Sequence, residues 1–311
     1  MVSTNEIGVL VVTHGGTLTE QWGELFLEAV QKAEIPCPTR VVWLVKGKFA
    51  LPTLSPRVRS LIGGELGKAL AAFESENINK IVVVPFYLFS QGQEQDRIRY
   101  TLGLKPLPPS ETGLAGFGRG GVLKHRAKIV MTPGMDNHPL IIGIILERAT
   151  ELSRKPENDA VVIIAKRPGA ESLEQIRRKM DMLADSMKVG GGFKDVGYGF
   201  IMEVKRTYLP DAVGDEEAKN TREIISRLKT KVSGNVIVLP LFLSDGIMNR
   251  LEIPRLIEGL ECLYDPRPFL PHGNVSRWIK QMAQEGIKEF AAQNSQPIKT
   301  ERSITRGKIS S

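Results

Sequence analysis

The chain has 311 residues, of which 41% are hydrophobic and 25% charged, and its formal net charge is +7. This length suits two domains better than one, and the composition is typical of a globular protein with substantial buried cores. No stretch approaches the ~20 apolar residues that a transmembrane helix needs, so we expect no membrane association. We interpret the apolar run that ends at His14 as a strand rather than a signal peptide.

Cysteines and basic residues narrow the class of protein further. Cys37 and Cys262 are the only two cysteines and lie far apart, which argues against a zinc ribbon or iron–sulfur site and favours a reducing, cytoplasmic location. Part of the positive charge lies in residues 297–311, a polar segment that we expect to be disordered. The positive charge that remains in the rest of the chain is compatible with a small polyanionic ligand. Because the sequence shows no basic stripe that contains aromatic residues, we do not expect nucleic-acid binding.

Short apolar runs rich in Val and Ile predict four buried parallel strands, at residues 9–13, 81–85, 161–165 and 236–240, and residues 127–131 are also strand-like. Amphipathic patterns predict helices at residues 19–32, 60–73, 140–153, 173–187, 217–228 and 275–290. Because strands and helices alternate, we expect an α/β fold with mainly parallel sheets.

Three pairs of segments resemble each other and indicate an internal repeat. Residues 8–16 parallel residues 160–169, residues 82–92 parallel residues 237–246, and residues 133–140 parallel residues 268–274. We therefore predict two similar modules, each a mainly parallel sheet flanked by helices. Their expected limits are residues 1–155, with a Pro- and Gly-rich loop at 105–121, and residues 156–292, followed by a basic tail at 293–311.

His14 is the first candidate functional residue. It ends the first predicted strand, and open α/β sheets bind ligands at the carboxyl ends of their strands. Gly15 and Gly16 follow it and would let a substrate approach the backbone closely. The helix expected next would direct its N-terminal dipole to the same place. A histidine that is merely hydrogen-bonded at a strand end is the competing interpretation.

The second candidate segment follows the strand at residues 81–85 and contains Gln91, Gly92, Gln93 and Glu94. If the two strands are neighbours, these amides and this carboxylate come within reach of His14. The competing interpretation is a solvated helix start, because acidic residues favour the first turn of a helix. His138 lies in a proline-bounded turn before a helix, where capping and substrate contact are both open.

These motifs together resemble the class II tetrapyrrole chelatases, the CbiX/SirB-like family of sirohydrochlorin cobalt- and ferrochelatases. Thr13-His14-Gly15-Gly16 is similar to the His-Gly-Ser turn of that family, and residues 83–93 are similar to its second strand and Gly-Gly-His turn. Residues 133–139 resemble a later Pro-Leu-Gly-x-His-Pro turn. The resemblance covers nearly all of residues 5–290, as two tandem modules.

The resemblance implies a metal site and a macrocycle site. In that family two histidines bind the incoming metal, and one of them also removes protons from the ring. In this chain His14 matches the first histidine, whereas Gln93 stands at the place of the second. In the second module, Lys166 and Met248 stand at the two corresponding places. A carboxamide is a poor ligand beside an imidazole and no base at neutral pH, so Glu94 is a further candidate ligand. The expected substrate contacts are Gly15, Leu88, Phe89, Ser90, Gln91, Gly92, Gln93 and His138.

The leading hypothesis is therefore a chelatase that inserts Co²⁺ or Fe²⁺, as a substrate, into a sirohydrochlorin-like tetrapyrrole without an organic cofactor. His14 would be catalytic, and the metal would meet His14, Gln93 and Glu94. We expect a monomer in which the modules are related by a pseudo-twofold axis. Two alternatives stay open: a metal or tetrapyrrole carrier or sensor descended from a chelatase, and a nucleic-acid-associated protein that uses its basic tail.

Overall fold

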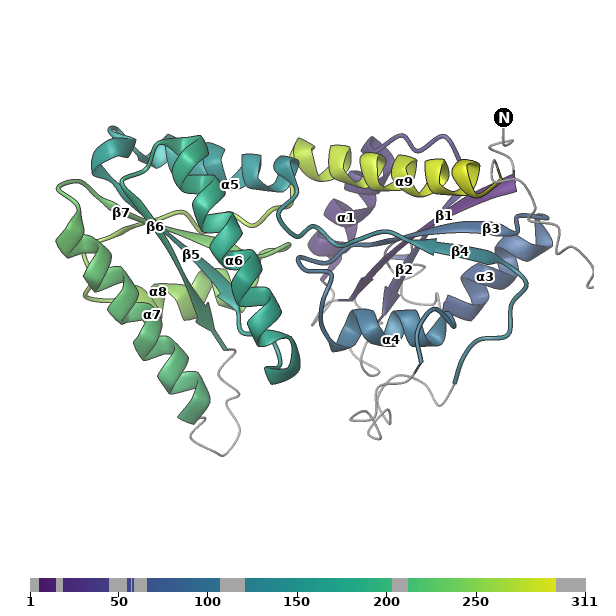
Figure 1. Ribbon diagram of the computed structural model, residues 1–311, viewed down its shortest axis with the longest axis horizontal. Coiled ribbons are helices and arrows are strands. Elements are labelled where there is room, and N and C mark those ends of the chain that lie inside the picture. Colours follow the sequence, from purple (N-terminus) through teal and green to yellow (C-terminus); the bar gives the residue numbers. More distant parts are fainter. Residues whose placement is uncertain are drawn as a thin grey trace, which may run out of the picture.

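Two parallel sheets, each covered by helices, form the molecule (Figure 1). This computed structural model describes residues 6–14, 19–44, 55–56, 58, 66–106, 121–202 and 212–294. The predicted Gly15–Gly16 turn, most of the 105–121 loop and most of the basic tail lie outside the described residues.

Each sheet has four parallel strands in the same spatial order. The first sheet has the order β2-β1-β3-β4 and contains β1 (Ile7–His14), β2 (Thr39–Leu44), β3 (Lys80–Pro85) and β4 (Lys128–Met131). The second has the order β6-β5-β7-β8 and contains β5 (Ala160–Lys166), β6 (Asp195–Ile201), β7 (Val236–Leu241) and β8 (Leu263–Tyr264). The predicted α/β fold of two similar modules is confirmed.

Helices flank both sheets. Those of the first half are α1 (Glu20–Lys32), α3 (Leu66–Ser75), α4 (Gln93–Thr101) and α5 (Pro139–Leu152). Those of the second half are η3 (Pro156–Asn158), α6 (Ala170–Gly191), α7 (Ala212–Lys231), η4 (Met248–Glu252), α8 (Ile253–Ile257) and α9 (Gly273–Asn294). Among the described residues, no helix combines the length and the apolar character needed to cross a membrane.

The inner strands divide their side chains between two buried faces, as alternation along a strand requires. In β1, Val9 and Val11 enter a cluster that spans both halves, whereas Leu10 and Val12 enter a cluster on the opposite face, toward α3 and α4. Val161 and Ile163 of β5 likewise enter the shared cluster. One hydrophobic cluster is therefore shared by the two halves, and each half has a further cluster of its own on the opposite face of its sheet.

The last helix of each half packs against the other half. α9 lies along β3, β4 and α1 of the first half, and α5 contacts β7 and α6 of the second half (Figure 1). Trp278 of α9 is fully buried, and its ring centroid lies 6.1 Å from that of Phe86. The two halves are therefore joined by packed helices as well as by the continuous backbone. The limits at residues 1–155 and 156–292 stay a prediction.

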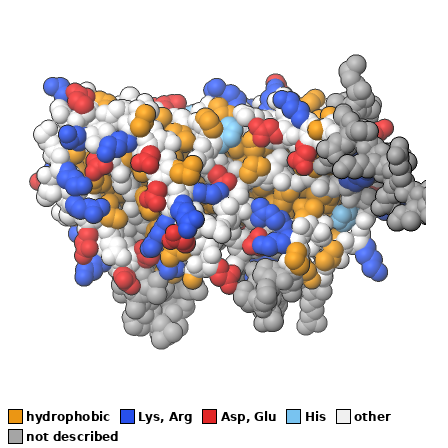
Figure 2. Space-filling model, in the orientation of Figure 1, with side chains coloured by type: hydrophobic (Ala, Val, Ile, Leu, Met, Phe, Trp, Pro, Cys, Tyr) orange, Lys and Arg blue, Asp and Glu red, His pale blue; other side chains and the backbone are white. Residues whose placement is uncertain are grey.

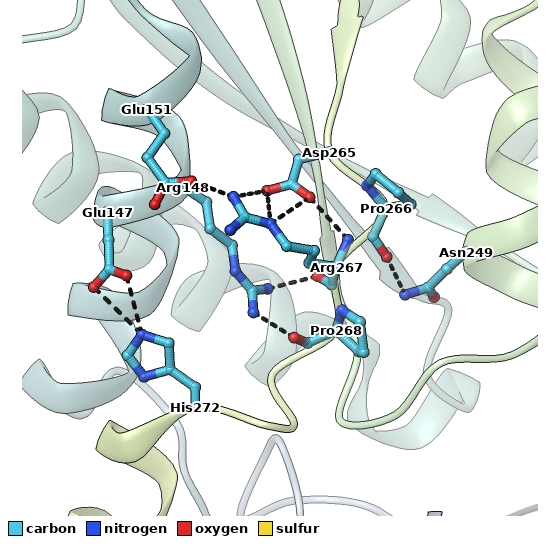
Figure 3. A network of polar contacts seen from close by, with 9 residues as sticks. All are labelled: Glu147, Arg148, Glu151, Asn249, Asp265, Pro266, Arg267, Pro268 and His272. Carbon is cyan, nitrogen blue, oxygen red and sulfur yellow. Dashed lines mark hydrogen bonds and ion pairs between the residues drawn. The ribbon is translucent and has the colours of Figure 1, made fainter. Parts of the chain in front are cut away.

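A polar network secures the exchanged helices where they meet (Figure 3). Buried Arg148 of α5 donates to the carbonyl oxygens of Arg267 and Pro268, just before α9. Arg267 pairs in turn with Asp265 and with Glu151 of α5. The network ties the end of the first half to the segment that begins α9.

Candidate active site

His14 and the segment after Pro85 lie on neighbouring strands. β1 pairs with β3, with Val12 opposite Pro85, and the amide of Phe86 donates to the carbonyl of Val12 at 2.7 Å. The Thr13 hydroxyl, one residue before His14, donates to the carbonyl of Phe86 at 3.3 Å. The backbone of His14, opposite Leu44 of β2, thus ends at the carboxyl edge where the candidate segment begins. The side chain of His14 lies outside the described part of the chain.

Gly92 turns the candidate segment into α4. Its φ of 133° is in a region that L side chains rarely adopt, so this position requires glycine. Gly92 is the N-cap of α4, and Gln93 is the first residue of the helix. Because glycine has no side chain, the first turn of α4 has no side-chain cap. The Gln93 side chain is exposed, whereas Glu94 is half-buried with a carboxylate oxygen 3.6 Å from a guanidinium nitrogen of Arg97.

A cleft of about 550 Å³ separates the two halves beside this helix start. One wall comes from the segment after β3, α4 and the residue Lys105; the other comes from the start of α6, after β5. Its lining residues are Ser90, Gln91, Gly92, Gln93, Asp96, Arg99, Lys105, Gly169, Ala170, Glu171, Ser172 and Gln175. Both walls therefore belong to the carboxyl ends of central strands, which is where parallel sheets place their ligands.

Positive and negative side chains are balanced inside the cleft. Asp96 accepts ion pairs from Arg99 at 3.3 Å and from Lys105 at 3.0 Å, and Glu171 lies on the opposite wall. Neither α4 nor α6 has a side-chain cap at its first turn, and the N-cap of α6 is Gly169. Because the side-chain charges balance, the preference of the cleft for an anionic group comes from the uncapped helix starts.

Asp136 joins the cleft-lining loop to its surroundings. Its carboxylate accepts hydrogen bonds from the Ser90 amide at 2.9 Å and from the Ser90 hydroxyl at 2.5 Å. The same carboxylate forms an ion pair with Lys179 of α6. Sequence reasoning singled out Ser90 but missed both charged residues, because nothing in the local pattern reveals a pair 43 positions apart.

Other predicted site residues lie elsewhere. Leu88 and Phe89 pack against the shared hydrophobic cluster, and the cleft lining described above includes neither. His138 is the N-cap of α5: its Nδ1 accepts from the amide of Leu140 at 3.2 Å. Burial lowers the pKa of His138, and Glu285 opposes that effect in part. The capping interpretation of His138 is confirmed, while its contact with substrate stays a prediction.

The basic side chains that follow β3 and β5 divide into two groups. Arg99 lines it, whereas Arg167 pairs with Glu217 at 2.9 Å and Arg97 lies beside Glu94. Lys105 was not singled out as a cleft residue, although it begins the Pro- and Gly-rich loop. Over the face in Figure 2, basic and acidic side chains are interspersed, with no field of one sign.

Tyr87 is a second residue that the sequence did not reveal. Burial, together with the charge of Glu94, raises the pKa of Tyr87 well above its usual value, so its hydroxyl stays protonated. That hydroxyl is buried and has no hydrogen-bond partner among the described residues. In the first half, the amide of Met135 donates to the carbonyl of Tyr87 at 2.8 Å. In the second half, the amide of Phe269 donates to the carbonyl of Phe242 at the same distance, so Phe242 occupies the place of Tyr87.

The part of the chain that the structure describes contains no group of three or more His, Cys, Asp or Glu side chains that could hold a metal ion. Gln93 and Glu94 are adjacent on the first turn of α4, so they project in different directions from the helix. The proposed ligand set of His14, Gln93 and Glu94 stays a prediction.

Two parallel four-stranded modules whose carboxyl edges meet at one cleft define the fold of the class II tetrapyrrole chelatases, which is the fold that the sequence motifs predicted. The chain is similar over 93% of its length to SirB from Bacillus subtilis with Fe³⁺, covering 98% of that chain at 16% identity and a TM-score of 0.62. It is also similar to the sirohydrochlorin chelatase SirB from Bacillus subtilis subspecies spizizenii in complex with cobalt, with the same coverage, 13% identity and a TM-score of 0.58.

A third similar structure is DR2241 from Deinococcus radiodurans, a multi-domain protein with structural similarity to chelatases. The match has 18% identity and a TM-score of 0.51, and covers 93% of this chain but 60% of that one. No protein-family model matches the sequence, and no curated protein matches it. At these identities the similarity establishes the fold.

Proposed function

We propose that this protein inserts a divalent metal, Co²⁺ or Fe²⁺, into a sirohydrochlorin-like tetrapyrrole. The observation that carries the proposal is the cleft between the two halves, which meets the candidate segment beside the strand that ends at His14. Its volume of about 550 Å³ is within the range of small-molecule sites, roughly 300–1,000 Å³. Two solved structures of the same fold are described as holding iron or cobalt.

The reaction exchanges two pyrrole N–H protons for one metal ion. His14 would bind the incoming metal through a neutral imidazole nitrogen and, once the metal has passed to the ring, accept one of the two protons, while the other would pass to solvent water. Gln93 is a weak ligand, so Glu94 would supply the carboxylate that helps to strip water from the metal. Both metal and macrocycle are substrates, and no organic cofactor is needed.

The cleft offers contacts for the carboxylates of such a macrocycle. Arg99 and Lys105 share one carboxylate, that of Asp96, and both are accessible to solvent, so each can also bind a carboxylate of the substrate. The uncapped first turn of α6 provides amide groups on the facing wall. A cytoplasmic, monomeric protein, as expected from the sequence, is part of this proposal.

The test is the visible spectrum of sirohydrochlorin mixed with Co²⁺ or Fe²⁺ and the purified protein under anaerobic conditions. We expect conversion to the metallated spectrum at a rate well above that of the same mixture without protein. A rate equal to the protein-free rate with both metals would contradict the proposal.

A non-catalytic carrier or sensor is the second candidate, and Gln93 favours it, because a carboxamide replaces the second histidine that the resemblance implies. Equilibrium titration separates the two functions. Saturable tetrapyrrole or metal binding without metallation supports the carrier, whereas turnover of several macrocycles per protein excludes it.

A further inference from the structure

A single carboxylate, that of Asp136, connects the two walls of the cleft. Its contacts to Ser90 reach the first wall, because Ser90 itself lines the cleft and Asp136 holds both its amide and its hydroxyl. The Ser90 carbonyl accepts two hydrogen bonds from the guanidinium of Arg99, each at 3.2 Å. The position of Asp136 is therefore transmitted to Arg99, a cation that lines the cleft.

The second wall is reached through Lys179. Ser172, Gln175 and Lys179 follow one face of α6 at helical spacing, and the first two line the cleft. The ion pair between Lys179 and Asp136 stands one turn, about 6 Å, beyond Gln175. Asn137 strengthens the attachment, because its side-chain amide donates to the Lys179 carbonyl at 3.0 Å.

The backbone at Asp136 indicates that this arrangement is specific to the first half. Asp136 has a φ of 41°, in the left-handed region that non-glycine residues rarely adopt. Its amide donates to the Leu88 carbonyl at 2.7 Å, just as the Leu270 amide donates to the Leu243 carbonyl in the second half. Leu270 thus occupies the equivalent place in the second half, and its φ is not positive. Its apolar side chain can neither accept a hydrogen bond from a serine nor form an ion pair with a lysine.

We infer that Asp136 is a positioning residue that sets the separation of the two cleft walls, through the bridging cluster formed by Ser90, Asp136 and Lys179. The ion pair is half-buried, so water screens it only in part. The effect of this separation on the binding of a macrocycle rests on the proposed function. The effect of Asp136 on the separation itself does not.

The first experiment measures the distance between the two halves that carry the walls. Spin labels are placed at the exposed positions Lys68 of α3 and Glu174 of α6, after the replacements Cys37→Ala and Cys262→Ser. In Asp136→Asn and in Lys179→Met, we expect the distance distribution to broaden or shift. Asparagine tolerates the left-handed backbone, so the first variant removes charge without adding strain. Lys179→Met leaves the contacts between Asp136 and Ser90 intact. If Asp136→Asn does not fold, the distance distribution of Lys179→Met alone tests whether the bridging cluster sets the separation.

The matched control is Lys188→Met, which removes an ion pair of α6 that stays within the second half, to Asp195 at 3.2 Å. Its distance distribution should equal that of the parent. Unchanged distributions in both variants of the bridging cluster overturn the inference, and so does an equal change in the Lys188→Met control.

The second experiment is kinetic. In the metallation assay, Asp136→Asn and Lys179→Met should raise the KM for sirohydrochlorin about tenfold while kcat changes little, because misplaced walls weaken binding and leave the reacting groups intact. An unaltered KM in both variants overturns the role in substrate binding. If the wild-type protein inserts no metal, the proposed function fails, and the distance measurement still tests the bridging cluster by itself.

Discussion

Gly286 of α9 lies directly against Val82 of β3: a Cβ atom built on Gly286 would stand 2.3 Å from Cγ1 of Val82. Val82 is fully buried at the centre of the first sheet, and Gly286 belongs to the last helix of the second half. The exchange of helices between the halves therefore depends on a close approach that only glycine permits.

Gly286→Ala should destabilise the protein. Alanine favours a helix by up to about 1 kcal/mol over glycine, but overpacking against a stiff β-branched side chain costs about 1–3 kcal/mol. We expect a net loss of about 1–2 kcal/mol in the free energy of unfolding, measured by urea denaturation. Gly190→Ala in α6 is the matched control, since its nearest neighbour is the flexible end of Leu146 at 3.3 Å. Equal stability of the two variants would contradict the account of the helix exchange.

Arg148→Met should destabilise the junction of α5 and α9. The substitution leaves the carbonyls of Arg267 and Pro268 without their charged donor, and charge-assisted hydrogen bonds contribute about 1.5–3 kcal/mol each. We expect a loss of about 3 kcal/mol or more by chemical denaturation, since two such bonds are removed. The control, Arg178→Met, removes an exposed arginine of α6 and should change stability by less than ~0.5 kcal/mol. A loss no larger than that of the control would show that the network contributes little.

His138 should make the stability of the protein depend on pH. Since burial lowers its pKa in the folded state below the ordinary 6.5, the unfolded chain binds more protons between those two values. The contribution of His138 is therefore complete above pH 6.5 and is lost as the pH falls through the lowered folded pKa. His138→Asn keeps a capping side chain, and we expect it to flatten the dependence of the melting temperature on pH below 6.5. An identical slope in both proteins would exclude His138 as its source.

Gln93→His tests the place where the metal would meet α4. Gln93 is exposed and lines the cleft, so an imidazole can be accommodated there without repacking the core. Because imidazole is a far better ligand for Co²⁺ than a carboxamide, we expect about tenfold tighter binding by calorimetry. Gln175→His, on the opposite wall, serves as the control and should leave the affinity unchanged. Equal affinities of the wild-type and Gln93→His proteins would argue against a metal site at this helix start.

The sequence predicts the centre of each sheet but, among the four edge strands, only β4, which coincides with the strand-like residues 127–131. β1, β3, β5 and β7 are the inner strands, buried on both faces, and therefore appear as continuous apolar runs. β2 and β6 are edge strands with partly exposed residues, and β8 has two residues, so none of them gives a clear pattern.

The exchange of α5 and α9 could not be predicted because an amphipathic pattern gives the buried face of a helix but not its partner. The candidate segment at residues 90–93 was predicted, since glycine and the strand end are local features. Asp136 and Lys179 were not, because their pairing depends on the packing of one half against the other.

The central claim is that His14 acts in metal insertion, and the initial rate of Co²⁺ insertion into sirohydrochlorin tests it most directly. We expect His14→Ala to lower this rate about 100-fold or more, because the variant lacks both a ligand and a base, while Arg178→Met, an exposed position of α6, retains the wild-type rate. A His14→Ala protein that metallates sirohydrochlorin as fast as the wild type would contradict the account.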